Sequence, residues 1–140
     1  MDLPVEESRR RFGAARVARL ATVSAQGQPH LVPVTFAARD DVVVVAVDHK
    51  PKRSAELRRL ANIEATGWVS LLVDEYDEDW SRLWWVRADG TAQVLRAAAD
   101  RAQPVRWLCE KYPQYAQRPP DGPVIRAEVV RWRGWAFSRG

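Results

Sequence analysis

The sequence predicts a mainly β protein, an antiparallel barrel of six strands, closed or partly closed, with two helices inserted between strands. Short polar turns join the first three expected strands, β-branched residues fill the third, and helical spacing separates the later strands in only two places. A doubly wound parallel sheet would alternate strand and helix throughout. The chain has 140 residues, 46% hydrophobic and 29% charged, which suits a single domain over residues 1–140.

The first part of the chain predicts a short helix followed by a three-stranded antiparallel meander. Residues 6–12 are charged with few apolar side chains, and Gly13 can end a helix there. Residues 25–28 contain the glycine and polar side chains of a tight turn, and residues 39–41 form a second polar turn. The strands that these turns join are expected at residues 17–24, 30–38 and 42–47.

The rest of the chain predicts two helices and three further strands. Asp89 and Gly90 either turn a hairpin or mark a bulge inside one bent strand. Pro104 either breaks the second helix or opens its second part, and Pro113 stops that helix. The helices are expected at residues 51–65 and 97–112, and the strands at 68–74, 83–95 and 124–137.

Composition excludes several classes of protein. The longest apolar run, residues 42–47, is far shorter than the roughly 20 residues that a membrane span needs. The acidic first residues do not resemble a secretory signal, so we expect a cytoplasmic protein. Cys109 is the only cysteine, which excludes an intrachain disulfide and a multi-cysteine zinc site. A net charge of +4 alone does not choose between nucleic acid, an acidic surface and a phosphorylated small molecule.

A basic cluster lies where a buried strand leads into a helix. It comprises His49, Lys50, Pro51, Lys52, Arg53 and Ser54. Free N–H groups and the helix dipole favour an anion at a helix N-terminus, and two lysines, an arginine and a hydroxyl are added there. The cluster is therefore a candidate phosphate site, with a solvated basic helix face as the alternative.

Two further features suggest a surface for a flat ligand. Pro33 interrupts the ladder of its strand, which leaves backbone groups free to bond a heterocycle or marks an ordinary edge strand or bulge. Seven tryptophans are many for a small domain, and at period 2 Trp84 and Val86 share one strand face while Trp85 and Arg87 share the other. Core packing explains one face, and a stacked ligand or a subunit interface explains the other.

Neither a metal site nor a hydrolase is indicated. His30 and His49 are the only histidines, and neither has the partner pattern of a metal pair or a nucleophilic triad. The acidic residues 74–79 lack the spacing of a calcium loop and are expected to be a solvated loop. Cys109 lies beside Trp107 and Leu108, where a buried and unreactive thiol is expected.

An ordered set of motifs resembles the pyridoxamine-phosphate-oxidase-like family, and more narrowly its deazaflavin-dependent branch, which uses coenzyme F420. The resemblance covers residues 16–137 and implies a six-stranded split β-barrel of the FMN-binding type. Residues 65–68 depart from the Asn-Pro turn that the family would place before the fourth strand. The motifs are Ala-Arg-Leu-Ala-Thr-Val from residue 18, Gly-Gln-Pro-His from 27, Val-Pro-Val-Thr-Phe from 32, the cluster at 50–54, Val-Ser-Leu-Leu-Val-Asp from 69 and Trp-Val-Arg-Ala-Asp-Gly from 85.

The resemblance implies a homodimer with two cofactor sites at the subunit interface, and neither nucleic acid nor a membrane as a partner. The phosphate lies near the start of the first barrel helix, the ring system lies along the second strand, and a wall comes from the same or the partner subunit. By position, the implied cofactor-binding residues are Lys50, Lys52, Arg53 and Ser54 for the phosphate, Pro33, Val34 and Thr35 for the ring, and Trp80, Trp85 and Arg87 for the wall.

The reaction that the resemblance implies is hydride transfer between C5 of the reduced deazaflavin and an unsaturated small-molecule substrate. The protein then supplies orientation, electrostatics and exclusion of water, and no side chain need act as a nucleophile. The proton source is open among Tyr76, Arg87 and bulk water. Two alternatives remain: an FMN-dependent enzyme on the same barrel, and a non-enzymatic protein that carries the cofactor, haem or another tetrapyrrole.

Overall fold

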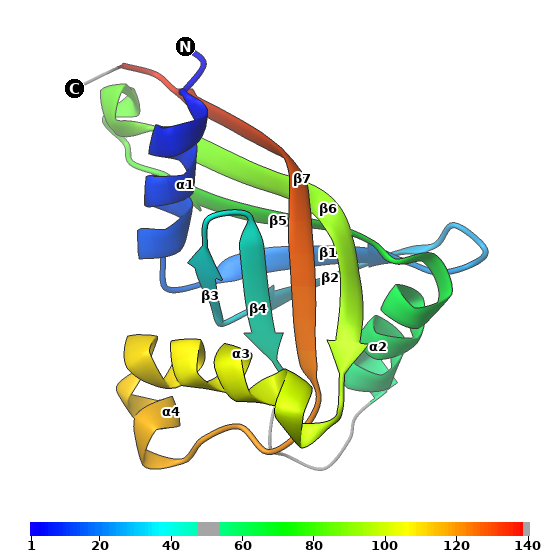
Figure 1. Ribbon diagram of the computed structural model, residues 1–140. Coiled ribbons are helices and arrows are strands. Elements are labelled where there is room, and N and C mark those ends of the chain that lie inside the picture. The colour runs from blue at the N-terminus through cyan, green and yellow to red at the C-terminus, as the bar shows by residue number, and fades with distance from the viewer. Residues whose placement is uncertain (48–53, 139–140) are drawn as a thin grey trace.

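One antiparallel sheet dominates the computed structural model, which describes residues 1–47 and 54–138, with only the backbone for 54–57 (Figure 1). The sheet has seven strands in the order β2-β1-β5-β6-β7-β4-β3. The strands are β1 (Ala18–Val23), β2 (Pro29–Val34), β3 (Phe36–Arg39), β4 (Val42–Ala46), β5 (Trp68–Glu75), β6 (Trp84–Leu95) and β7 (Val124–Ala136).

The barrel is split at the bend between β2 and β3. These strands lie at opposite edges of the sheet although only Thr35 separates them along the chain. Val34 still pairs with β1, whereas Phe36 already pairs with Val45 of β4. The prediction of one strand over residues 30–38 was therefore wrong at Thr35, and this division makes seven strands of the expected six. The mainly β split barrel itself is confirmed.

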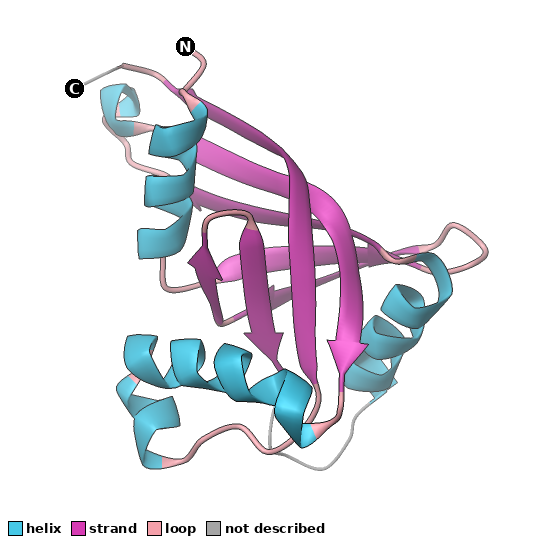
Figure 2. Ribbon diagram, in the orientation of Figure 1, coloured by secondary structure: helices cyan, strands magenta, loops and turns pink. Residues whose placement is uncertain are grey.

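Four helices flank the sheet (Figure 2). Pro104 lies within α3 without ending it, and α3 ends before Pro113, which opens a further short helix. Gly67, at a φ of +75°, follows α2 and donates its N–H to the carbonyl of Ile63 at 2.8 Å, which gives the corner before β5 its shape. No helix in the described parts of the chain is long and apolar enough to cross a bilayer. The helices are α1 (Val5–Ala14), α2 (Ser54–Thr66), α3 (Ala98–Lys111) and α4 (Pro113–Gln117), with a 3-10 turn at Trp80–Arg82.

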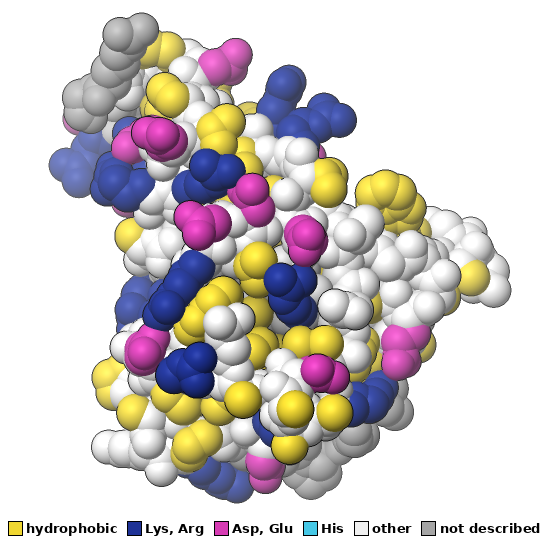
Figure 3. Space-filling model, viewed as in Figure 1, with side chains coloured by type: hydrophobic (Ala, Val, Ile, Leu, Met, Phe, Trp, Pro, Cys, Tyr) yellow, Lys and Arg dark blue, Asp and Glu magenta, His cyan; other side chains and the backbone are white. Residues whose placement is uncertain are grey.

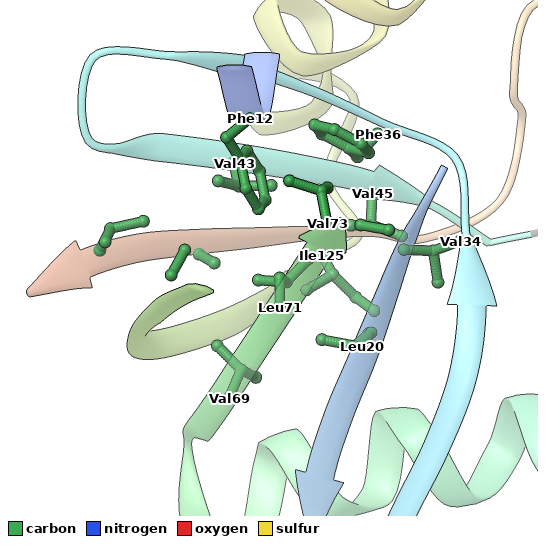
Figure 4. Packing of buried hydrophobic residues seen from close by; sticks show 14 of the residues in the cluster. Phe12, Leu20, Val34, Phe36, Val43, Val45, Val69, Leu71, Val73 and Ile125 are labelled. Atoms are coloured by element: carbon green, nitrogen blue, oxygen red, sulfur yellow. The ribbon is translucent and has the colours of Figure 1, made fainter. Parts of the chain in front are cut away.

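The inner face of the sheet forms the core, and two helices contribute to it (Figure 4). Phe12 of α1 packs its ring 4.9 Å from that of Phe36. Leu60 and Ile63 of α2 are buried in the same cluster, and Asn62 donates to the hydroxyl of Thr22 at 3.0 Å. These contacts hold α2 against β1.

A bulge bends the two longest strands. β6 runs unbroken through Asp89 and Gly90, so the hairpin alternative was wrong. The register with β7 shifts between these two residues: Asp89 faces Arg131, whereas Gly90 faces Val129. A Cβ at position 90 would overlap the carbonyl oxygen of Glu128, so only glycine fits this close approach of the two backbones.

Candidate functional site

Large apolar side chains are exposed on the outer face of the sheet. Leu31 of β2 has 66% of its surface exposed and Trp68 of β5 has 60%. Single exposed apolar residues are ordinary, but neighbouring ones on one sheet face mark a binding or interaction surface. We call the outward side of β2, β1, β5 and β6 the outer face.

The outer face is hollowed over its centre. The central hollow has a volume of about 650 Å³ and takes its lining from four adjacent strands. A smaller hollow of about 350 Å³ adjoins it and shares Ala21 and Ser70 with it. The central hollow is lined by Arg19, Ala21, Leu31, Ser70, Leu71, Leu72, Asp74, Trp85 and Arg87.

Strand register explains which side chains meet there. Arg19 lies opposite Pro33 on β2 and opposite Leu72 on β5, and Leu72 in turn lies opposite Arg87 on β6. Residues directly opposite each other in a sheet point to the same side, so these four form one row across the outer face. The row has a cation at its centre and another at its β6 end.

The two arginines of the row differ in their partners. Arg87 donates from Nε to Asp89 at 2.9 Å, and Ser70 donates its hydroxyl proton to the same carboxylate at 2.8 Å. Arg19 has neither a hydrogen-bond nor an ion-pair partner within residues 1–47 and 54–138. Elsewhere, on the face that Figure 3 shows, acidic and basic side chains are interspersed rather than gathered into one basic patch.

The structure brings together some of the residues implied by the resemblance. Trp85 and Arg87 both line the central hollow, and Pro33 is exposed in the same row. Val34 is buried in the core, and the hydroxyl of Thr35 is bonded to that of Tyr115 at 2.8 Å. The side chains of Val34 and Thr35 thus have partners within the protein, and neither residue lines the central hollow.

The remaining predicted residues lie away from the hollow or outside the described residues. Trp80 stands on the 3-10 turn, 59% exposed, with its indole N–H 3.4 Å from the hydroxyl of Tyr76. It is not among the lining residues of the described hollows. Lys50, Lys52 and Arg53 lie outside the described residues. Ser54 is the first residue of α2, and its side chain is not described.

The helix α2, which carries Arg58 and Arg59, lies close to β2. Burial lowers the pKa of His30, and the positive charges of Arg58 and Arg59 lower it further. The hydrogen bond from Asn62 of α2 to Thr22 of β1, which lies opposite His30 in the sheet, fixes the helix beside this strand. Arg58 is exposed, whereas Arg59 is 8% exposed and leaves little of its side chain to a surface ligand.

Sequence reasoning missed Arg19 and Leu31 as residues of the hollow. The signal was present, because Arg19 alternates with the apolar Ala18 and Leu20 in a predicted strand. Alternation identifies the outward side of one strand, but it does not tell which strands lie side by side. The pairing of β1 with both β2 and β5 makes the outward side of β1 the middle of the site.

Comparison with known proteins agrees with this fold. An FAD-binding protein from Mesorhizobium loti has a TM-score of 0.74 at 21% identity, covering 96% of this chain and 95% of that one. An FAD-binding protein from Mycobacterium smegmatis has a TM-score of 0.70 at 17% identity, covering 99% and 100%. The heme storage protein HutZ from Vibrio cholerae has a TM-score of 0.69 at 18% identity, covering 94% and 91%.

The sequence itself identifies the family. No curated protein sequence matches the chain. The chain does match the pyridoxamine 5'-phosphate oxidase family over residues 5–136, which include all seven strands of the sheet. The protein therefore belongs to the pyridoxamine 5'-phosphate oxidase family.

Proposed function

We propose that the chain binds a flavin-type cofactor on its outer face and is an oxidoreductase that transfers hydride between reduced coenzyme F420 and an unsaturated organic substrate. The observation that carries this proposal is the central hollow of about 650 Å³, whose lining includes Trp85, Leu31 and Arg87. Ligand sites combine apolar walls with a few placed polar groups, and this hollow has that composition.

The residues present fit a flat, anionic cofactor. Trp85 and Leu31 offer apolar surface to a ring system, and Arg87 keeps guanidinium N–H groups beyond the Nε that is bonded to Asp89. Lys50, Lys52, Arg53 and Ser54 are proposed to hold the phosphate, and the position of α2 close to His30 of β2 supports this arrangement.

The chain's own contribution is to bind the cofactor and the substrate and to shield the reacting atoms from water. A bound deazaflavin supplies the hydride. The strand row of Pro33, Arg19, Leu72 and Arg87 gives a rigid floor on which two flat molecules can be held face to face. Covering this floor with a second copy of the chain would exclude water from the reacting atoms.

Two other functions have specific support. Structures similar to this chain include proteins described as FAD-binding, which favours a flavin such as FMN as the alternative cofactor. HutZ is described as a heme storage protein, which favours a carrier of haem or another tetrapyrrole with no enzymatic activity. Each would use the same hollow, because at about 650 Å³ it is larger than the adjoining hollow of about 350 Å³.

Titration with both cofactors tests the proposal. Dissociation constants for coenzyme F420 and FMN are measured on the purified protein at low and high ionic strength, followed by hydride-transfer assays over a panel of unsaturated compounds. We expect a moderate preference for coenzyme F420 that salt weakens, because its anionic tail needs further basic residues such as the exposed Arg58. FMN binding that is equal or tighter at low salt favours the flavin enzyme, and binding without any turnover favours the carrier.

A further inference from the structure

The central hollow contains a cation that the cofactor proposal leaves unused. Arg19 lies at the middle of the row across the outer face, one strand from Pro33 and two strands from Arg87. At the usual strand spacing this places the backbones at Arg19 and Arg87 about 9.5 Å apart. The two arginines can therefore hold different groups.

Arg19 also lines a neighbouring hollow of about 450 Å³ at the end of α1. The other arginines there already have partners. Arg10 and Arg11 both bond to Glu7, and they lower the pKa of that carboxyl to about 2. Arg16 donates to the carbonyl of Lys111 at 3.1 Å. Arg19 thus lines both hollows. Among the arginines that line them, it is the one whose guanidinium has no hydrogen-bonding partner in the described residues.

The acidic groups nearby do not neutralise Arg19. Asp74 lines both hollows, but the two side chains form no ion pair. Glu75 lines the hollow at the end of α1 and is absent from the lining of the central hollow. A guanidinium in this position offers paired N–H donors that match a carboxylate.

We propose that the substrate carries a carboxylate and that Arg19 binds it, with the unsaturated part of the substrate lying in the central hollow against Leu31 and Trp85. This inference rests on the proposed function for the site, and it adds the substrate class. Arg19 is a specificity-determining residue in this account. The reaction itself takes place at the other end of the substrate.

A matched pair of ligands tests the inference without any turnover. The full chain, with and without bound cofactor, is titrated calorimetrically with trans-cinnamate and with trans-cinnamamide, which differ in charge and share an unsaturated, flat body. We expect the carboxylate to bind about fivefold more tightly than the amide, as for a partly exposed ion pair. The preference should disappear in Arg19→Gln, persist in part in Arg19→Lys, and widen in Asp74→Asn.

A control variant shows whether the preference depends on Arg19 itself or on net charge. Arg118→Gln removes an equal charge from an exposed position that lines neither hollow, and its preference should equal that of the wild type. The inference is overturned if the wild type binds neither ligand, if it binds both equally, or if Arg19→Gln keeps the preference. It is also overturned if the only effect of Arg19→Gln is weaker binding of coenzyme F420 relative to FMN, because Arg19 would then bind the cofactor tail. An Arg19-dependent preference in a protein that binds no flavin would refute the proposed function alone.

Discussion

The hydroxyl of Tyr112 holds the bend at which the barrel is split. It accepts the N–H of Phe36 at 3.1 Å and lies 3.0 Å from the carbonyl of the same residue and 2.9 Å from that of Arg16. Phe36 pairs with Val45 of β4 on one side, and β3 has no neighbouring strand on its other side, where the hydroxyl of Tyr112 bonds both the N–H and the carbonyl of Phe36. Tyr112, the residue between α3 and α4, thereby links the start of β3 to the segment that precedes β1.

Removal of that hydroxyl should destabilise the protein. Tyr112→Phe leaves buried backbone groups of Phe36 without a partner, and we expect the free energy of unfolding to fall by about 1–3 kcal/mol. Urea denaturation followed by circular dichroism measures the change. Tyr76→Phe serves as the control, because Tyr76 is exposed and its hydroxyl makes only long contacts. Equal stability of the two variants would contradict the role given to Tyr112.

Lys111 makes stability depend on pH. Its ammonium donates to the carbonyl of Ala15 at 2.6 Å and lies 3.8 Å from the centre of the Phe36 ring. Burial, and secondarily the charge of Arg16, lower the pKa of Lys111 from 10.5 to about 8. Above the lower value the folded lysine is neutral while the unfolded one still binds a proton, so stability rises with pH in this interval.

The comparison with Lys111→Met isolates this effect. Between pH 8 and 10, where Tyr112 keeps its proton because burial raises its pKa, the wild type should gain stability relative to the variant. Urea denaturation at several pH values gives the difference in free energy of unfolding. A constant difference, or one that moves in favour of the variant, would show that Lys111 titrates normally in the folded state.

Individual site residues were predictable where strand alternation sufficed. Trp85 and Arg87 were expected on one face and Trp84 and Val86 on the other; the first pair lines the hollow, Val86 is buried, and Trp84 packs against the core. Arg19 was not predicted, because its importance comes from the pairing of β1 with β2 and β5. Sequence alternation carries no information about such long-range neighbours.

At the scale of elements, the bulge in the β6–β7 pair sets the curvature of the sheet. Gly90→Ala would force the backbones of the two strands apart at Glu128, and we expect a loss of about 1–3 kcal/mol or more in the free energy of unfolding. Gly122→Ala is a suitable control, since a Cβ there would make only an ordinary contact at 3.7 Å from the carbonyl oxygen of Val47. Thermal denaturation compares the two, and similar melting temperatures would argue against a constraint at position 90.

Element types were predicted better than their ends. Periodicity identified the long last strand and the helices expected at 51–65 and 97–112, which the structure shows over Ser54–Thr66 and Ala98–Lys111; residues 51–53 lie outside the described residues. The break at Thr35 has no such signal, since residues on both sides continue the same apolar pattern. The short helix α4 bonds through Tyr115 to Thr35, a tertiary contact across 80 residues of sequence that no local pattern indicates.

In the molecule as a whole, the outer face of the sheet exposes apolar residues that a second protein surface could bury. We predict a homodimer that buries this face, with a total interface of at least about 1,200 Å². Leu31, Trp68 and Val130, all more than half exposed, belong to the outer face and its hollows. Sedimentation equilibrium should give twice the mass of the chain at micromolar concentration, and Leu31→Glu should shift it toward the monomer. A monomer throughout would contradict the prediction.

The fold followed from the sequence more readily than the cofactor did. Alternating apolar residues and polar turns specify an antiparallel barrel whatever it binds. Coenzyme F420 and FMN both carry a flat ring system and a phosphate, so a basic cluster such as residues 50–54 suits either one. The outer-face residues that distinguish them would have to contact the parts in which the two cofactors differ.

We propose that the cofactor ring binds on the outer face beside Trp85. The most direct test is the dissociation constant of coenzyme F420, read from its own fluorescence, for the wild type, Trp85→Leu and Trp107→Leu, the last replacing a tryptophan of α3 that lines no described hollow. We expect Trp85→Leu to weaken binding about fivefold or more, because an aromatic contact is lost, and Trp107→Leu to bind as the wild type does. Equal dissociation constants for all three proteins would contradict it.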